Sequence, residues 1–167
     1  MPKAETFILN KTEIDHKIKR MAYQIYEANV SETDIIIAGI VSNGYVLAEK
    51  LKRTLEKISP IKVTLCKVTI DKTNPIAPLT TSLSATTYAN KSLVLVDDVL
   101  HSGTTLIYGV KHFLDVPLKQ FKTAVLVDRN HKKYPIKADY KGISLSTSIN
   151  ENVSVIFEKG KDRAILE

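Results

Sequence analysis

Two adjacent carboxylates, Asp97 and Asp98, have the sequence setting that most clearly indicates chemistry. They follow the hydrophobic run Val94-Leu95-Val96 and precede the small-residue loop Ser102-Gly103-Thr104-Thr105. In open α/β sheets, ligands bind at the C-terminal ends of the strands. Such a loop directs backbone N–H groups and hydroxyls at an anion, helped by the N-terminus of the following helix. The carboxylates do not bind a phosphate directly, so they require sugar hydroxyls or a magnesium ion, and a ribose 5-phosphate meets both requirements.

A plainer interpretation of this segment is that Asp97 and Asp98 cap a helix and that the loop is a tight turn. The coincidence of strand, acid pair and loop favours a binding site instead. The sequence has no Gly-x-x-x-x-Gly-Lys, which excludes a Walker-type phosphate loop, and no Gly-x-Gly-x-x-Gly to support a dinucleotide site.

The elements that must position this segment alternate between helical and strand patterns. Asn10 and Glu13 form the pattern of a capping box at the start of an amphipathic helix that ends near Asn29. Continuous β-branched runs such as 34–40 are typical of strands buried on both faces of a parallel sheet. Helices are expected over about 10–29, after 44 and over 104–114, and strands over 34–40, 61–70, 93–97, 121–128 and 152–158, with 159–161 turning into a short final strand. The alternation predicts one α/β domain over residues 1–167 with right-handed crossovers.

Residues 71–90 interrupt this alternation. They hold two prolines and many threonines and serines with little periodicity. A segment of this length without a clear pattern indicates a functional flap or a weak hairpin.

Length and composition limit the class of protein. The chain has 167 residues, of which 44% are hydrophobic and 25% charged, as in a single soluble globular domain. It has no apolar run long enough to span a membrane, and no hydrophobic segment follows residues 1–5, so we expect no signal peptide, no membrane partner and a cytoplasmic location. The single cysteine, Cys66, excludes an internal disulfide and a cysteine-rich zinc site, and its strand-like surroundings favour a buried, inert thiol. The net charge of +6 favours anionic ligands, either phosphorylated metabolites or nucleic acid.

The segment 94–105 resembles the phosphoribosyl pyrophosphate signature of type I phosphoribosyltransferases. A wider resemblance points to the PyrR-type proteins of that family, which are pyrimidine operon attenuators with uracil phosphoribosyltransferase activity. It includes the segments Ile8-Leu9-Asn10, Ala38-Gly39-Ile40, Ala124-Val125-Leu126-Val127-Asp128-Arg129-Asn130-His131, Pro135-Ile136-Lys137-Ala138-Asp139-Tyr140 and Thr147-Ser148. The resemblance covers most of the chain and is weakest over 71–90.

The resemblance implies a fold and a set of site residues. The fold would be a mostly parallel twisted sheet flanked by helices, with a flexible flap at about 71–90. A small hood would come from about 128–150 and the N-terminal segment. Asp97 and Asp98 would be the catalytic pair that holds the ribose hydroxyls, directly or through magnesium-bound water. The remaining contacts would be His101, Ser102, Gly103, Thr104 and Thr105 around the 5′-phosphate, Ser42, Asn43, Gly44 and Lys72 at the pyrophosphate, and Val127, Asp128 and Arg129 at the base.

The reaction implied by the resemblance joins uracil to phosphoribosyl pyrophosphate, giving UMP and pyrophosphate, with magnesium as cofactor. Several family cations are replaced in this chain. Val41 and Asn43 stand where PyrR-type proteins usually carry a lysine and an arginine, and Thr104 stands where an arginine is common. In the flap, Asp71-Lys72-Thr73-Asn74 replaces the usual Tyr-Arg-Asp-Asp, so only Lys72 keeps a cation. Loss of two hydrogen bonds to charged groups weakens pyrophosphate binding by roughly 10²–10⁴-fold if the losses add.

Two other functions therefore stay open. One is a UMP-sensing, RNA-binding regulator of pyrimidine genes with weak or no catalysis, and the other is a purine phosphoribosyltransferase. Basic residues that would face RNA are Lys19, Arg20, His131, Lys132 and Lys137, although charge clusters are commonly only solvated faces. The resemblance also implies a homodimer or a higher homo-oligomer.

Overall fold

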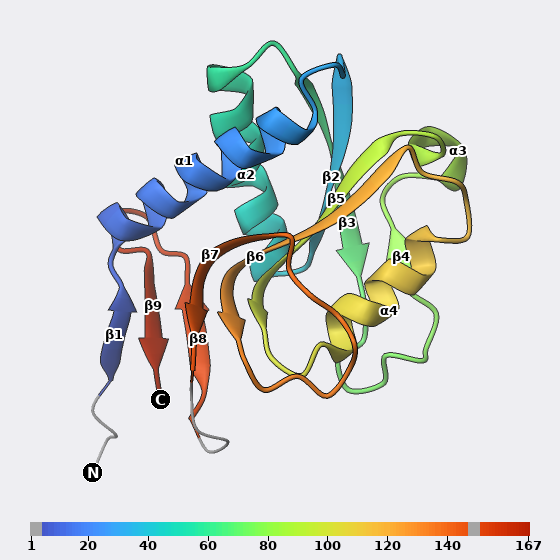
Figure 1. Cartoon of the computed structure of the whole chain (residues 1–167). Helices are drawn as coiled ribbons and strands as arrows, with labels where there is room; N and C mark the ends of the chain where they lie inside the picture. Colours follow the sequence, from blue (N-terminus) through green and yellow to red (C-terminus); the bar gives the residue numbers. More distant parts are fainter. Residues whose placement is uncertain (1–4, 147–150) are drawn as a thin grey trace.

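The computed structural model describes residues 5–146 and 151–167, which form two β-sheets and four helices (Figure 1). The helices are α1 (Lys11–Ala28), α2 (Asn43–Ile58), α3 (Ala85–Tyr88) and α4 (Thr104–Phe113). The strands are β1 (Thr6–Leu9), β2 (Asp34–Ile40), β3 (Lys62–Thr69), β4 (Thr80–Thr81), β5 (Ser92–Leu100), β6 (Gln120–Arg129), β7 (Tyr140–Leu145), β8 (Val153–Ile156) and β9 (Arg163–Leu166).

The larger sheet confirms the expected α/β architecture. Its strand order is β4-β3-β2-β5-β6-β7, and all neighbours are parallel except β4, which runs antiparallel to β3. One core cluster packs α1 and α2 against one face of this sheet, and a second cluster packs α4 against the other (Figure 1). Burial of both faces explains why β2, β5 and β6 are nearly continuous hydrophobic runs.

Helix α1 forms where its capping pattern predicts. The Asn10 side chain accepts a hydrogen bond from the Glu13 backbone N–H at 2.9 Å, and the Glu13 carboxylate accepts one from the Asn10 N–H at 3.1 Å. The buried side chains of this amphipathic helix are Ile14, Ile18, Met21, Ala22 and Ile25.

The small sheet differs from the expected hood. The N-terminal segment contributes β1, which the sequence patterns did not indicate, and the sheet order is β1-β9-β8. Residues 140–145, expected in the hood, instead form β7 at the edge of the larger sheet, because they pair in parallel with β6. The hood strands β8 and β9 come from the C-terminal segment, whereas residues 147–150, including Thr147 and Ser148, lie outside the described residues.

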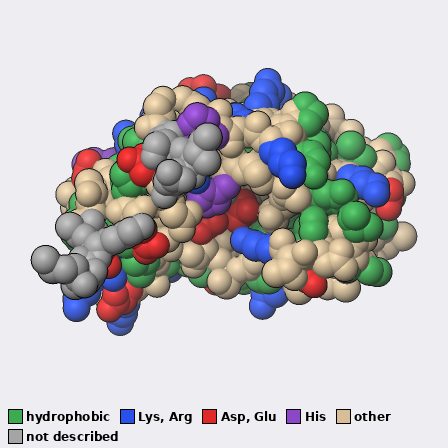
Figure 2. Space-filling view, turned by 90° about the horizontal axis from the view of Figure 1, so that it is seen from below, with side chains coloured by type: hydrophobic (Ala, Val, Ile, Leu, Met, Phe, Trp, Pro, Cys, Tyr) green, Lys and Arg blue, Asp and Glu red, His purple; other side chains and the backbone are tan. Residues whose placement is uncertain are grey.

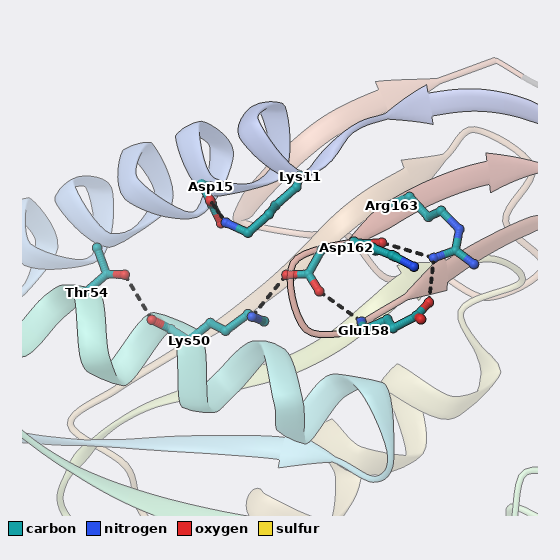
Figure 3. A network of polar contacts seen from close by, with 8 residues as sticks. Lys11, Asp15, Lys50, Thr54, Glu158, Asp162 and Arg163 are labelled. Atoms are coloured by element: carbon teal, nitrogen blue, oxygen red, sulfur yellow. Dashed lines mark hydrogen bonds and ion pairs between the residues drawn. The ribbon is translucent and has the colours of Figure 1, made fainter.

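A buried ion pair fastens the small sheet to α2. Asp162, on the turn between β8 and β9, is 5% exposed and lies 3.1 Å from the Lys50 ammonium (Figure 3). Its other oxygen accepts a hydrogen bond from the Glu158 N–H at 3.0 Å. Both oxygens of this buried carboxylate are thus satisfied, as burial of a charge requires.

The segment 71–90, for which a flap or a weak hairpin was expected, contains a short antiparallel pairing. Two residues, Thr80 and Thr81, pair with β3, and the short helix α3 follows. Its N-terminal turn is held by Asp71, whose carboxylate accepts hydrogen bonds from the N–H groups of Thr73 and Asn74. This turn brings Lys72 to the C-terminal end of the sheet.

Strand β5 extends further than the sequence indicates. Its ladder with β6 continues through Asp97↔Val125 to Leu100↔Asp128. The acid pair therefore lies inside the strand, and the expected strand end at Asp97 was wrong.

Two simpler expectations can be compared directly with the structure. Cys66 is fully buried, and burial raises the pKa of its thiol, which keeps it protonated and unreactive. None of the helices in the described parts of the chain is long and apolar enough to cross a bilayer.

Candidate active site

A cavity of about 290 Å³ opens around the C-terminal half of β5 and the start of α4. It is lined by the continuous segment 97–106 together with Lys72 and Val125. Figure 2 shows acidic side chains in a hollow of this face, with histidine and basic side chains beside them. The structure thus brings together the residues predicted for ribose, for the 5′-phosphate and for the flap cation.

The two carboxylates of the cavity differ in their surroundings. Asp97 is only 4% exposed and accepts a hydrogen bond from the Asp98 N–H at 2.9 Å, whereas Asp98 is half-buried. The Lys72 ammonium lies 4.0 Å from the nearer oxygen of Asp97. Burial, followed by the neighbouring charge of Asp98, raises the pKa of Asp97 to about 8, and Lys72 opposes this shift. Asp97 therefore holds a proton at neutral pH in the ligand-free protein.

The loop that precedes α4 is braced from behind. The Ser102 carbonyl accepts hydrogen bonds from the N–H groups of Lys133 at 2.7 Å and Tyr134 at 3.1 Å. The Ser102 and Thr104 hydroxyls lie 2.8 Å apart, and Gly103 between them has a φ of +89°. The N–H groups at the first turn of α4 and these two hydroxyls form an anion site of the expected kind.

Replacing Gly103 by alanine is expected to destabilise the protein by about 2–4 kcal/mol and to weaken phosphate binding. The positive φ strains any side chain, and the new Cβ would lie 2.4 Å from Cγ2 of Ile136. Gly160→Ala is the matched control, since Gly160 also has a positive φ, +77°, but its Cβ would meet nothing within 4 Å. Thermal unfolding of both variants measures the difference, and equal losses would show that Ile136 contributes nothing.

The expected pyrophosphate loop lies beside the cavity rather than in its wall. The Asn43 amide nitrogen donates to Asp98 Oδ2 at 3.2 Å and to the Val155 carbonyl at 2.8 Å, so both of its hydrogens are used. Gly44 packs so closely on β5 that a Cβ would lie 2.7 Å from the Val96 carbonyl oxygen. Neither Ser42 nor Gly44 carries a cation, so this loop offers a pyrophosphate only backbone groups and a serine hydroxyl.

The three residues predicted for the base do not line the cavity. Val127 is fully buried in the core, and Asp128 is buried between two ammonium groups, Lys132 at 3.3 Å and Lys141 at 3.6 Å. Arg129 reaches the cavity indirectly, because its Nη1 lies 2.9 Å from Nδ1 of His101. A contact between the base and Val127 or Asp128 would have to use their backbone.

The residues predicted to face RNA have several different settings. Lys19 is exposed on α1, and His131 is exposed just after β6. Lys132 pairs with Asp128, and Lys137 lies 3.7 Å from Asp139. Arg20 is committed to the fold, since its Nη2 donates to the carbonyls of Lys141 at 3.1 Å and Gly142 at 2.6 Å.

Replacing Arg20 by glutamine is expected to lower the free energy of unfolding by about 1–2 kcal/mol, because two carbonyls of the edge strand β7 lose a charged donor. Lys19→Gln, one residue earlier and exposed, is the control and should change stability by less than about 0.5 kcal/mol. Urea unfolding followed by circular dichroism distinguishes the two. Equal stability of the two variants would show that the hydrogen bonds from Arg20 to the β7 carbonyls do not stabilise the fold.

Two backbone carbonyls that hold side chains of the site, those of Val155 and Glu151, were not indicated by the sequence. The first accepts from Asn43, and the second accepts from Arg129 Nη2 at 2.7 Å. No local signal could have found them, because each joins backbone of the C-terminal segment to a side chain more than 20 residues away in sequence.

A mostly parallel sheet, an acid pair on its central strand and an anion loop at the next helix are the features of a phosphoribosyltransferase. A family model described as "Phosphoribosyl transferase domain" matches residues 7–157, and the chain belongs to that family.

Curated relatives narrow the resemblance. The "Bifunctional protein PyrR" of Fusobacterium nucleatum is 32% identical over 95% of this chain and 96% of its own length. The protein of the same name from Macrococcus caseolyticus is 32% identical over 93% and 94%. The resemblance to PyrR-type proteins is thus confirmed.

Solved structures confirm the fold. A hypoxanthine phosphoribosyltransferase of Trypanosoma cruzi superposes with a TM-score of 0.77, at 20% identity, over 92% of this chain and 86% of that one. A hypoxanthine-guanine phosphoribosyltransferase of Bacillus anthracis gives a TM-score of 0.74, at 21% identity, over 89% and 84%. At these identities the likeness concerns the fold alone.

Proposed function

We propose that the protein transfers the 5-phosphoribosyl group from phosphoribosyl pyrophosphate to uracil, forming UMP and releasing pyrophosphate. The observation that carries this proposal is the cavity that holds Asp97 and Asp98 next to the anion loop of α4. The bond from the anomeric carbon to the pyrophosphate oxygen breaks, and a bond from that carbon to a uracil nitrogen forms, with loss of the proton on that nitrogen. The choice of uracil rests on the resemblance to PyrR-type proteins, a name that the curated relatives carry.

The chain's own residues would act by positioning and by charge. The hydroxyls of Ser102, Thr104 and Thr105 and the N–H groups of the first turn of α4 would hold the 5′-phosphate. Asp97 and Asp98 would hold the ribose hydroxyls and face the positive charge that develops on the sugar. Lys72, carried by the flap, would approach the departing pyrophosphate. No nucleophile of the protein is required, since holding the reactants in line contributes much of the rate.

Magnesium fits this site only together with the ligand. The described residues contain no cluster of three or more histidine, cysteine, aspartate or glutamate side chains able to hold a metal ion. Two carboxylates, water and pyrophosphate oxygens are nevertheless the hard oxygen ligands that magnesium prefers. Asp97 and Asp98 would hold the ion through water, and it would neutralise charge on the leaving pyrophosphate.

A second function is favoured by Asn43. Its side chain is neutral and both of its amide hydrogens are engaged with Asp98 and Val155, so Asn43 offers a pyrophosphate neither a cation nor an unused amide donor. The protein would then be a UMP-sensing, RNA-binding regulator with weak or no turnover. A purine phosphoribosyltransferase shares the same cavity and differs in the base.

Calorimetric titration with UMP, and separately with phosphoribosyl pyrophosphate plus magnesium, tests the first proposal. Binding of both, followed by product formation with uracil in a screen of pyrimidine and purine bases, supports the transferase. Binding of UMP alone favours the regulator, which then requires a salt-dependent shift of pyrimidine-operon leader RNA that UMP strengthens. Binding of neither would contradict both functions.

The assembly is a further proposal. We expect a homodimer or a higher homo-oligomer, and sedimentation velocity measures it directly. A monomer at the concentrations used for activity would contradict this expectation.

A further inference from the structure

His101 is the one histidine in the wall of the cavity, among the described residues. It is half-buried at the start of the loop between β5 and α4. Its Nδ1 lies 2.9 Å from Nη1 of Arg129, which is only 9% exposed. The other guanidinium nitrogen, Nη2, donates to the Glu151 carbonyl at 2.7 Å, so the guanidinium is held from both sides.

This contact fixes the proton on the imidazole. A guanidinium carries only donors and does not lose its proton in proteins. Nδ1 of His101 must therefore accept, which requires a lone pair there and places the ring proton on Nε2. A doubly protonated imidazolium would oppose an N–H of the ring to an N–H of Arg129.

The charges around the ring favour the same neutral form. Burial lowers the pKa of His101, the positive charge of Arg129 lowers it further, and Lys72 on the flap adds to this effect. Asp98 on β5 acts in the opposite direction. The net direction is downward, so the imidazole is neutral at pH 7.

The other ring nitrogen is available to a ligand. Nε2 makes no hydrogen bond with the described residues and is accessible to solvent. The ring lines the cavity. An N–H in that position is satisfied only by an acceptor that enters the cavity.

We propose that Arg129 fixes His101 as a neutral Nε2–H donor that recognises an oxygen of the bound nucleotide. His101 then does not take up the proton that the base loses, because its cavity-facing nitrogen is already protonated and its other nitrogen faces Arg129. The identity of the ligand in this inference rests on the proposed function. The tautomer and charge of the ring are inferred from the contact with Arg129 and do not depend on that function. The acceptor is an oxygen of the ribose phosphate or a base carbonyl, which share this chemistry.

The ring state is tested without ligand or activity. Long-range ¹H–¹⁵N correlation spectra of the ¹⁵N-labelled full chain at pH 7 report the tautomer of each histidine, and the His101→Gln spectrum assigns the signals of His101. We expect the Nε2–H tautomer alone at pH 7, with the ring taking up a proton only at a lower pH than an ordinary histidine. In Arg129→Met, the ring should titrate at higher pH or populate both tautomers. A wild-type spectrum with the proton on Nδ1, or with a charged ring, would overturn the proposal even if that variant does not fold.

The ligand is tested by titrating ribose 5-phosphate and UMP into the same sample. A shift of His101 Nε2 with both identifies a phosphate or sugar oxygen, and a shift with UMP alone identifies a base carbonyl. Binding of UMP by calorimetry without any shift of His101 would overturn the donor role. Failure of every ligand to bind would contradict the proposed function, and the ligand-free spectrum would still decide the state of the ring.

Turnover separates a donor from a base. His101→Gln keeps an N–H donor, and its kcat should fall by no more than about tenfold. His101→Phe removes the donor, and its affinity for UMP should fall by no more than about tenfold. General-base catalysis typically contributes 10²–10⁴-fold, and His101→Gln would lose that whole factor together with a limb of the pH profile. Such a loss would overturn the assignment of His101 as a donor.

Discussion

Replacing Asp97 and Asp98 together by asparagine is expected to lower kcat/KM by about 10²–10⁴-fold while leaving the fold intact. Both side chains face the cavity that also contains the anion loop of α4. Asparagine keeps their shape and their acceptor oxygens, so the hydrogen bond from the Asp98 position to the Asp97 position survives. The variant loses negative charge toward the developing positive charge of the sugar and toward magnesium, where preorganised charge has its largest effect.

The measurement is product formation from uracil and phosphoribosyl pyrophosphate, with circular dichroism to verify the fold. The matched control is Asp15→Asn with Asp34→Asn, which makes the same two chemical substitutions at partly exposed sites outside the cavity wall. That control should keep turnover within about twofold, since charges at the surface are screened. Turnover that survives in the cavity variant would remove both acids from the site.

The elements predicted most closely are those whose signals are local. The strand over 34–40 matches β2 at both ends because a β-branched run buried on two faces has no competing interpretation. The start of α1 matches because Asn10 and Glu13 lie within one turn of each other. In both cases, the residues that determine where the element begins or ends belong to the element itself or adjoin it.

The features that sequence patterns missed depend on distant partners. Strand β1 has only four residues, and its partner β9 follows at the other end of the chain. The end of β5 is decided by pairing with β6, which extends the ladder past Asp97 despite the two charges there. Strand β7 is similarly defined by its pairing with β6 and by the hydrogen bond from Arg20 of α1 to the Gly142 carbonyl.

The candidate site shows the same division. The segment 97–105 was predicted as a unit because one continuous stretch supplies its strand, acids and loop, and these do line one cavity. The bonds from Asn43 to Val155 and from Arg129 to His101 join segments that are separated in sequence. The family resemblance implied pyrophosphate and base contacts at these positions, whereas in the structure the Asn43 side chain holds Asp98 and the Arg129 side chain holds the imidazole of His101.

The buried state of Asp97 predicts a pH dependence of stability in the ligand-free protein. Its pKa is raised from 3.8 to about 8, chiefly by burial and then by Asp98. Below about pH 4 the carboxyl is protonated in both the folded and the unfolded chain, so it imposes no penalty. Between about pH 4 and 8 the unfolded chain releases this proton and the folded chain keeps it. The contribution of Asp97 to the free energy of unfolding therefore falls as pH rises, by about 1.4 kcal/mol per pH unit, and becomes constant above about pH 8.

Asp97→Asn removes this dependence, because an amide has the shape of the protonated acid and does not titrate. We expect the variant to gain stability relative to the wild type from pH 5 to pH 8, and the difference to be smallest near pH 4. Denaturant unfolding at each pH in the presence of a chelator measures the difference. Asp98→Asn is the companion variant: it removes the charge that helps to raise the pKa of Asp97, so the loss of stability should end at a lower pH than in the wild type. A difference between Asp97→Asn and wild type that stays constant from pH 4 to pH 8 would mean that Asp97 is already ionised in the folded protein, and that the carboxylate meets the sugar without first releasing a proton.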